Sequence, residues 1–421
     1  DRGVENSYGL YGDVAVVVLS RGGGEGSDMP TVTAEEADEK DLASHTGYVA
    51  QADGKVYKHF LQLTDSEEAL LDYVKAQGFK KIIYLVNSSE IFEMADLQND
   101  DAIDGILWIG RPGQTGTIGA ARILSGAVNP SGKTVDTWYA DFTADPIWQN
   151  SIGNQQVASD VTYTVAGQKT DTVTTEAAGI GGTATAYHGV DYEEGIYVGY
   201  RYYETRYEDA VMSTGNAGDY NWSTTVAFPF GYGDSYTTFE YSDFNVTESA
   251  DAFNVTLKVT NTGSTYSGKE TVQLYFQSPY TDYDKANGIE KASAELCGFA
   301  KTDVLAPGAS ETVNITVDKS ELRTYDANNA KTYIVDAGDY YFTAATDAHN
   351  AVNNILAAKG YTVENTDGRM TADGNVALTY KWTNAALDST TFATSENGTA
   401  ITNLFDESDP NTVSYTHLRA H

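Results

Sequence analysis

The chain has 421 residues, which is enough for two or three domains of roughly 150 residues each. Its 60 acidic residues outnumber its 26 basic residues and give a formal net charge of -34. This charge excludes a nucleic-acid binder that works by neutralising phosphates, and it disfavours an anionic membrane surface as a partner. Hydrophobic residues make up 41% of the chain, which suffices for packed cores.

The first third of the sequence alternates between predicted strands and helices. Val14–Leu19 is a continuous apolar, β-branched run, typical of a strand buried on both faces. Thr64 and Glu67 have the spacing of a capping box and predict the start of a helix. The later elements are expected, as strand, strand, helix and strand, at 81–86, 105–109, 116–124 and 134–136. The alternation predicts an α/β sandwich over residues 1–145, a mostly parallel sheet with helices on both faces.

The pattern changes twice further along the chain. Residues 146–237 begin with a stretch rich in Gly, Thr, Ser and Ala, and we interpret them as an insertion and connection. Over 238–347 the apolar period becomes two, with turn residues between short runs, which predicts an all-β immunoglobulin or fibronectin III-like sandwich. A short helix is expected over Ala351–Lys359. The last eight residues, 414–421, hold two histidines and no acid, and we expect them to be a foreign tail.

The sequence gives no sign of a metal or a cofactor. Cys297 is the only cysteine, which excludes an intramolecular disulfide and a cysteine-rich zinc site. The run Gly22–Gly26 fails the dinucleotide fingerprint because its sixth position is Ser27 or Met29 instead of glycine. No run of 18 apolar residues predicts a membrane helix, and no signal-peptide pattern is present. Cytoplasmic and secreted locations in a bacterium both stay open.

One segment places a carboxylate where ligands bind in α/β proteins. Arg21, Glu25 and Asp28 follow the predicted strand Val14–Leu19, at the carboxyl edge of the sheet. Glycines on both sides of Glu25 allow a ligand to approach the backbone closely, so this carboxyl group could act as a general acid. From composition alone, a flexible turn with a solvated Glu25 is the favoured interpretation.

A series of motifs along the chain favours a functional role for Glu25 over a solvated turn. Glu25–Asp28 resembles the G-E-G-x-D-R loop of glycoside hydrolase family 3, except that Met29 replaces its arginine. Further segments that resemble the family's motifs, including those of its fibronectin-like domain, are 63–71, 85–88, 106–116, 126–133, 194–203, 228–233, 259–263 and 298–308. Together they run from about Val14 to Asp347.

The resemblance implies a retaining exo-β-glycosidase, β-glucosidase-like, which hydrolyses O-glycosidic bonds through two carboxyl groups. It implies that Glu25 is the acid/base and that Arg21 and Asp28 bind substrate or support the loop. The family's nucleophile belongs to a (β/α)₈ barrel, and this chain has no eightfold βα repeat. We therefore expect no nucleophile in this chain and no activity from the chain by itself.

The resemblance also suggests where the barrel lies. Residues 348–413 resemble the linker that leads into the barrel of permuted family members, so we expect a fragment whose barrel belongs to the same polypeptide. The expected ligands are β-glycosides and oligosaccharides. The alternative is a non-catalytic carbohydrate-binding or surface-interaction protein built from the same domains.

Overall fold

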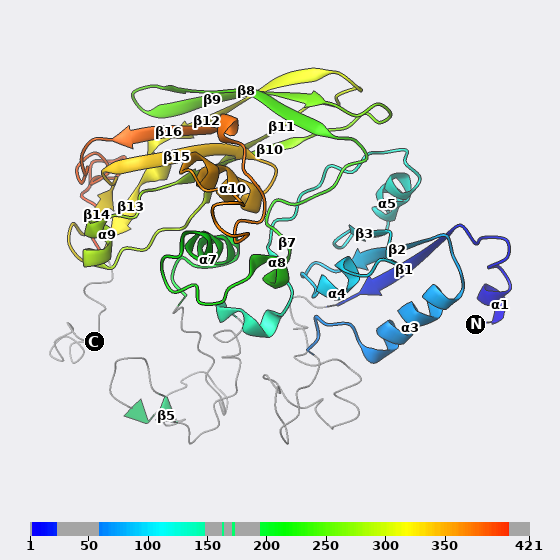
Figure 1. Ribbon diagram of the computed structural model, residues 1–421. Coiled ribbons are helices and arrows are strands. Elements are labelled where there is room, and N and C mark those ends of the chain that lie inside the picture. The colour runs from blue at the N-terminus through cyan, green and yellow to red at the C-terminus, as the bar shows by residue number, and fades with distance from the viewer. Residues whose placement is uncertain (1, 23–58, 148–161, 164–170, 173–193, 404–421) are drawn as a thin grey trace. The chain divides into compact units, whose positions relative to one another are not determined.

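The computed structural model describes residues 2–22, 59–147, 162–163, 171–172 and 194–403. Within it the chain forms two compact units. The first comprises residues 1–125, 138–195 and 224–228, and the second comprises 126–137, 196–223 and 229–421. Each unit is described by itself below, and both appear in Figure 1.

The first unit is built on a parallel sheet in the order β1-β2-β3. Its strands are β1 (Val14–Ser20), β2 (Lys81–Asn87) and β3 (Gly105–Trp108), and both pairings are parallel. The described helices of this unit are α1 (Arg2–Glu5), α3 (Asp65–Ala76), α4 (Ala95–Gln98), α5 (Thr117–Leu124) and the 3-10 turn η2 (Phe142–Ala144). Two short antiparallel pairs complete it, β4 (Trp138–Tyr139) with β7 (Val226–Phe228) and β5 (Thr162–Tyr163) with β6 (Asp171–Thr172).

Helix α3 begins as the sequence predicts and covers one face of the sheet (Figure 1). Thr64 is its N-cap, and both reciprocal bonds of the capping box with Glu67 are present. Leu71 and Val74 pack in one buried cluster with Val17 and Leu19 of β1. These four side chains are each at most 8% exposed, so the contact of helix and sheet excludes water.

Two expectations for this region are wrong. The alternate side chains of β1, at Val14, Val16 and Val18, are 45–55% exposed, so β1 is not buried on both faces within the described residues. β1 is an edge strand of the described sheet, and its other face receives no cover from these residues. Residues 134–136 form no strand, because only Thr134 exchanges backbone hydrogen bonds there, with Gly231 and Tyr232.

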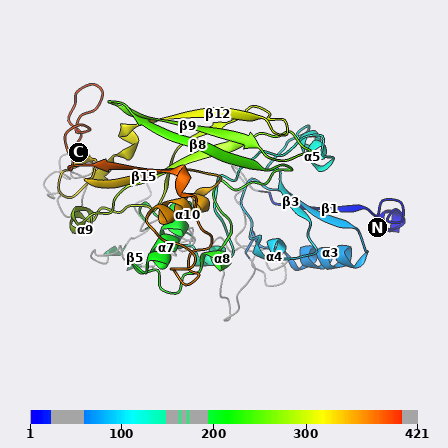
Figure 2. The ribbon, with the colours of Figure 1, turned by 45° about the horizontal axis from the view of Figure 1, so that its top comes forward.

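The second unit is an antiparallel sandwich of a three-stranded and a four-stranded sheet (Figure 2). The first sheet has the order β12-β9-β8, with β8 (Phe239–Glu248), β9 (Ala252–Asn261) and β12 (Ser310–Asp318). The second has the order β11-β10-β15-β16, with β10 (Thr271–Gln277), β11 (Glu295–Lys301), β15 (Gly338–Ala345) and β16 (Thr379–Asn384). Its remaining elements are α7 (Tyr200–Met212), α9 (Asp282–Asn287), η5 (Lys319–Leu322), β13 (Thr324–Asp326), β14 (Thr332–Ile334), α10 (Ala348–Ala358) and η6 (Val376–Leu378), and α8 (Trp222–Thr225) crosses between the units.

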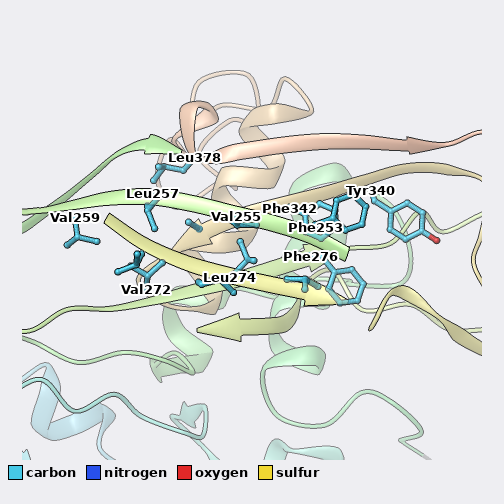
Figure 3. Close-up of a cluster of buried hydrophobic side chains, with 14 of the residues drawn as sticks. Phe253, Val255, Leu257, Val259, Val272, Leu274, Phe276, Tyr340, Phe342 and Leu378 are labelled. Atoms are coloured by element: carbon cyan, nitrogen blue, oxygen red, sulfur yellow. The ribbon is translucent and has the colours of Figure 1, made fainter. Parts of the chain in front are cut away.

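The core between the two sheets consists of the side chains that the period of two predicts. Figure 3 shows residues of β9, β10 and β15 meeting there, among them Leu257, Leu274 and Phe342. Each of the three is at most 1% exposed. The predicted order of a parallel α/β sheet followed by an antiparallel sandwich is therefore confirmed.

The four-stranded sheet is also covered on its outer face. Tyr275, which alternates with Leu274 and Phe276, belongs to a second buried cluster with Tyr207 of α7 and Val352 of α10. Residues 348–358 thus form a docked helix, and β16 pairs with β15, where the sequence analysis expected a linker. The helix starts earlier than predicted because the Asp347 side chain caps it by accepting from the backbone N–H of Asn350.

Truncating the sandwich core should unfold it more readily. We expect Leu257→Ala to lower the free energy of unfolding by about 2–5 kcal/mol, because burial is lost and a cavity is left. The exposed variant Asn314→Ala on β12 should change it by less than about 0.5 kcal/mol. Chemical denaturation of both variants measures the difference, and equal costs would contradict the assignment of this core.

Candidate functional site at the carboxyl edge of the parallel sheet

The parallel register brings three chain segments to one edge of the sheet. Ser20 pairs with Asn87, and Val86 pairs with Trp108, so the strands end close together. Arg21, Ser88 and Arg111 follow these ends in the sequence. This is the edge at which open α/β sheets bind ligands. Glu25 and Asp28 lie outside the described residues, so their roles stay predictions.

Arg21 is buried at this edge and all of its donors are engaged. Its side chain is 6% exposed, and its guanidinium forms a bidentate pair with Glu67, at 2.5 Å from Nη1 to Oε1 and 2.7 Å from Nη2 to Oε2. Nε donates to the carbonyl of Phe60 and Nη2 to that of Gln62, both at 2.8 Å, while Nη1 also donates to the Ser20 carbonyl at 3.0 Å. A guanidinium has five N–H donors, and these five contacts use them all.

The position of Arg21 favours the support role over the substrate role. With five donors occupied, Arg21 has none left for a sugar hydroxyl. Its guanidinium also lies 4.5 Å from the ring centroid of Phe92 and 5.5 Å from that of Phe60. Residue 21 is thereby joined to residues 60–67, which follow the segment that contains Glu25 in the sequence.

Glu67 supports this junction in two ways. Its Oε2 accepts from the Thr64 backbone N–H at 2.9 Å as part of the capping box, and both its oxygens accept from Arg21. Burial opposes ionisation of this carboxyl group, but the hydrogen bonds from Arg21 and Thr64 outweigh it and hold the pKa of Glu67 below its ordinary value. The carboxylate form therefore stabilises the fold.

A second polar cluster lies beside the first and was not anticipated. His59 is 2% exposed, and its Nε2 lies 2.8 Å from Oε1 of Glu93. Glu93 also accepts from Nε2 of Gln62 and from the backbone N–H of Phe142, both at 2.7 Å. The sequence gives no local signal for this contact, because its two residues lie 34 positions apart.

Glu90 is the described carboxylate at the end of β2. It accepts from Ser88 Oγ at 3.0 Å, from Ser89 Oγ at 2.6 Å and from Arg111 Nη2 at 3.2 Å. Burial would raise the pKa of Glu90, but these donors, Ser89 first, hold it below its ordinary value. Glu90 is therefore suited to accept hydrogen bonds from ligand hydroxyls and unsuited to donate a proton near neutral pH. The sequence analysis missed it.

The described residues offer no evident metal or membrane chemistry. Across them, no group of three or more His, Cys, Asp or Glu side chains is placed to hold a metal ion. Among the described helices, none combines the length and apolarity needed to span a bilayer.

Comparison with known proteins agrees with these two units. Residues 10–200 match the glycosyl hydrolase family 3 C-terminal domain, and residues 270–348 match the fibronectin type III-like domain. The chain carries the C-terminal domain of glycosyl hydrolase family 3. The fibronectin type III-like domain follows it.

Individual relatives and structures point the same way. A β-glucosidase of Ruminococcus albus is 33% identical over 69% of this chain and 25% of its own length. β-Glucosidase A of Butyrivibrio fibrisolvens is 29% identical over 81% of this chain and 36% of its own length. The structure of β-glucosidase 3B from Thermotoga neapolitana in complex with α-D-glucose aligns with a TM-score of 0.55 and 31% identity, over 80% of this chain and 36% of that one. The chain thus spans about a quarter to just over a third of these proteins.

The Arg21–Glu67 pair should stabilise the family 3 domain. In Arg21→Lys, one ammonium group cannot replace five directed donors, and buried carbonyls lose their partners. We expect the free energy of unfolding to fall by about 1.5–3 kcal/mol. Arg111→Lys is the matched control, because its side chain is 46% exposed and makes the single 3.2 Å contact with Glu90. Denaturation curves that show equal losses for the two variants would contradict the structural role of Arg21.

The lowered pKa of Glu67 makes the stabilisation by the Arg21–Glu67 pair dependent on pH. It is fully present above the unfolded pKa of about 4.3 and is lost as the pH falls through the lower folded pKa. The stability difference between wild type and Glu67→Gln should therefore be constant from pH 6 to 8 and shrink on acidification below about pH 4. Thermal unfolding at a series of pH values tests this, and a difference that grows in acid would refute it.

Proposed function

We propose that this chain is part of a retaining β-glycosidase, of β-glucosidase type, and that it supplies the acid/base carboxyl group. The observation that carries the proposal is the match of residues 10–200 to the family 3 C-terminal domain, together with relatives named β-glucosidases. Carbohydrates are therefore the expected substrates. The position of Arg21 and Glu67 at the carboxyl edge adds support, because a loop that starts there begins from a fixed point.

The chemistry needs two carboxyl groups on either side of the glycosidic bond. In the proposed mechanism, a carboxylate from a barrel elsewhere in the polypeptide attacks the anomeric carbon while Glu25 protonates the departing glycosidic oxygen. Glu25, now a carboxylate, then removes a proton from water, which attacks the glycosyl-enzyme and releases the sugar and the nucleophile. Glu25 ends the cycle protonated, so every proton is accounted for.

Glu25→Ala in the barrel-containing protein tests this assignment. Substrates with poor leaving groups require protonation and should slow by roughly 10²–10⁴-fold, while activated aryl glycosides should lose less in the glycosylation step. Added azide should restore deglycosylation and yield a β-glycosyl azide. Glu36→Ala, a change of an acid outside the Glu25–Asp28 loop motif, is the control and should keep normal rates. Normal hydrolysis of a disaccharide by Glu25→Ala would refute the assignment.

Comparing the chain alone with the barrel-containing protein distinguishes an enzyme from a protein that only binds carbohydrate. Purified residues 1–421 should not hydrolyse aryl-β-glycosides above the buffer rate, because an acid alone cannot form a glycosyl-enzyme. Joining the barrel should restore turnover. If the barrel-containing protein binds oligosaccharides but hydrolyses none, the non-catalytic carbohydrate-binding alternative is favoured.

A further inference from the structure

The sandwich unit contains a buried group of three charged side chains with an unbalanced charge. Lys291, Asp284 and Asp336 have side chains that are at most 4% exposed. Lys291 Nζ lies 2.6 Å from Oδ2 of Asp336 and 3.7 Å from Oδ1 of Asp284. If both carboxyl groups were ionised, this buried group would carry one net negative charge in a chain that is already strongly acidic.

The hydrogen bonds of the group leave one oxygen of each carboxyl group without a donor from the described residues. Oδ2 of Asp284 accepts from the Thr281 backbone N–H and from its hydroxyl, both at 2.7 Å, at the start of α9. Oδ2 of Asp336 accepts from Lys291, which also donates to Thr324 Oγ1 at 2.6 Å. Among the described residues, Oδ1 of Asp284 and Oδ1 of Asp336 are buried without a donor. Two such oxygens would be costly in a folded protein.

We propose that Asp284 and Asp336 share one proton between their Oδ1 atoms. The shared proton gives each leftover oxygen a partner and leaves one carboxylate opposite one ammonium, so the buried group becomes neutral. The two carboxyl groups face the same ammonium group, because Nζ of Lys291 lies within 3.7 Å of an oxygen of each. The proton joins α9 to the chain between β14 and β15, and Lys291 extends the connection to β13 through Thr324.

The surrounding charges are consistent with this state. Burial raises the pKa of Asp336, Lys291 opposes that rise, and Asp284 adds to it. Other titratable side chains whose electrostatics involve this group are Tyr280, Tyr283, Glu295 and Tyr340. Burial raises the pKa of Glu295 and of each of these tyrosines, and none of them adds a cation. Lys291 is therefore the counter-charge of the pair within the described group.

The shared proton has a definite effect on stability. A carboxyl group with a raised folded pKa holds its proton in the folded state after the unfolded chain has released it. The contribution of the pair is thus fully present below the unfolded pKa of about 3.9 and declines as the pH rises through the folded pKa. This end of the sandwich should therefore be more stable in mildly acidic solution than in alkaline solution.

Asp336→Asn tests the proposal because asparagine imitates the protonated form. Its amide can donate to Asp284 Oδ1, and its oxygen can accept from Lys291. We expect its melting temperature to match wild type near pH 4 and to exceed wild type as the pH rises through the folded pKa of Asp336. Asp388→Asn is the control with the opposite slope. Burial opposes ionisation of Asp388, but hydrogen bonds from Thr391 and Thr390 lower its pKa to about 2, so its substitution should cost most at neutral pH.

A direct measurement on the wild-type chain covers the case in which the variant fails to fold. Carboxyl ¹³C chemical shifts of aspartate-labelled protein should show that the pKa of Asp336 lies above its unfolded value of about 3.9. Shifts of fully ionised carboxylates at both positions from pH 4 to 8 would overturn the proposal. An Asp336→Asn variant that is less stable than wild type by the same amount at every pH would overturn it as well.

Discussion

The ion pair between Arg21 and Glu67 is the contact on which the described part of the candidate site depends. It connects the residue after β1 with the first turn of α3, across 46 positions of sequence. Since Arg21 also donates to the carbonyls of Phe60 and Gln62, removing the guanidinium would leave several buried acceptors without partners. A buried charge of this kind adds little net stability compared with an apolar core, but it fixes one geometry.

The same physical principle recurs in the sandwich unit with a different outcome. At Arg21 one cation meets one carboxylate, and hydrogen bonds keep the pKa of Glu67 low. At Lys291 one cation meets two carboxyl groups, and burial raises the pKa of Asp336. The two sites differ in which effect on the carboxyl group is larger: the hydrogen bonds at Glu67 outweigh burial, and burial at Asp336 outweighs Lys291.

The architecture also separates stability from chemistry. The sandwich has apolar layers on both faces of its four-stranded sheet, one against the three-stranded sheet and one against α7 and α10. The parallel sheet instead gathers polar side chains where its strands end, among them Arg21 and Glu90. The apolar layers stabilise the sandwich, whereas polar side chains beside a rigid sheet are the kind of group that can bind a ligand.

Local patterns in the sequence determined the elements that depend on neighbours along the chain. The period of two predicted the inward side chains of β9, β10 and β12, and the Thr64–Glu67 spacing predicted the start of α3, because both signals are written within a few residues. The family motifs predicted Glu25, Asp28 and Arg21 as a candidate loop, whereas the contacts of Arg21 with Phe60, Gln62 and Glu67 could not be predicted from them.

Tertiary structure decided everything that requires residues distant in sequence to meet. The partners of Arg21, the His59–Glu93 contact and the docking of α10 under β15 join segments separated by loops or by whole elements. The exposed face of β1 could not be read from Val14–Leu19, since an apolar run has the same sequence whether or not another element covers it. The hydrophobic pattern shows which side chains favour burial, and only the tertiary packing determines which of them are covered.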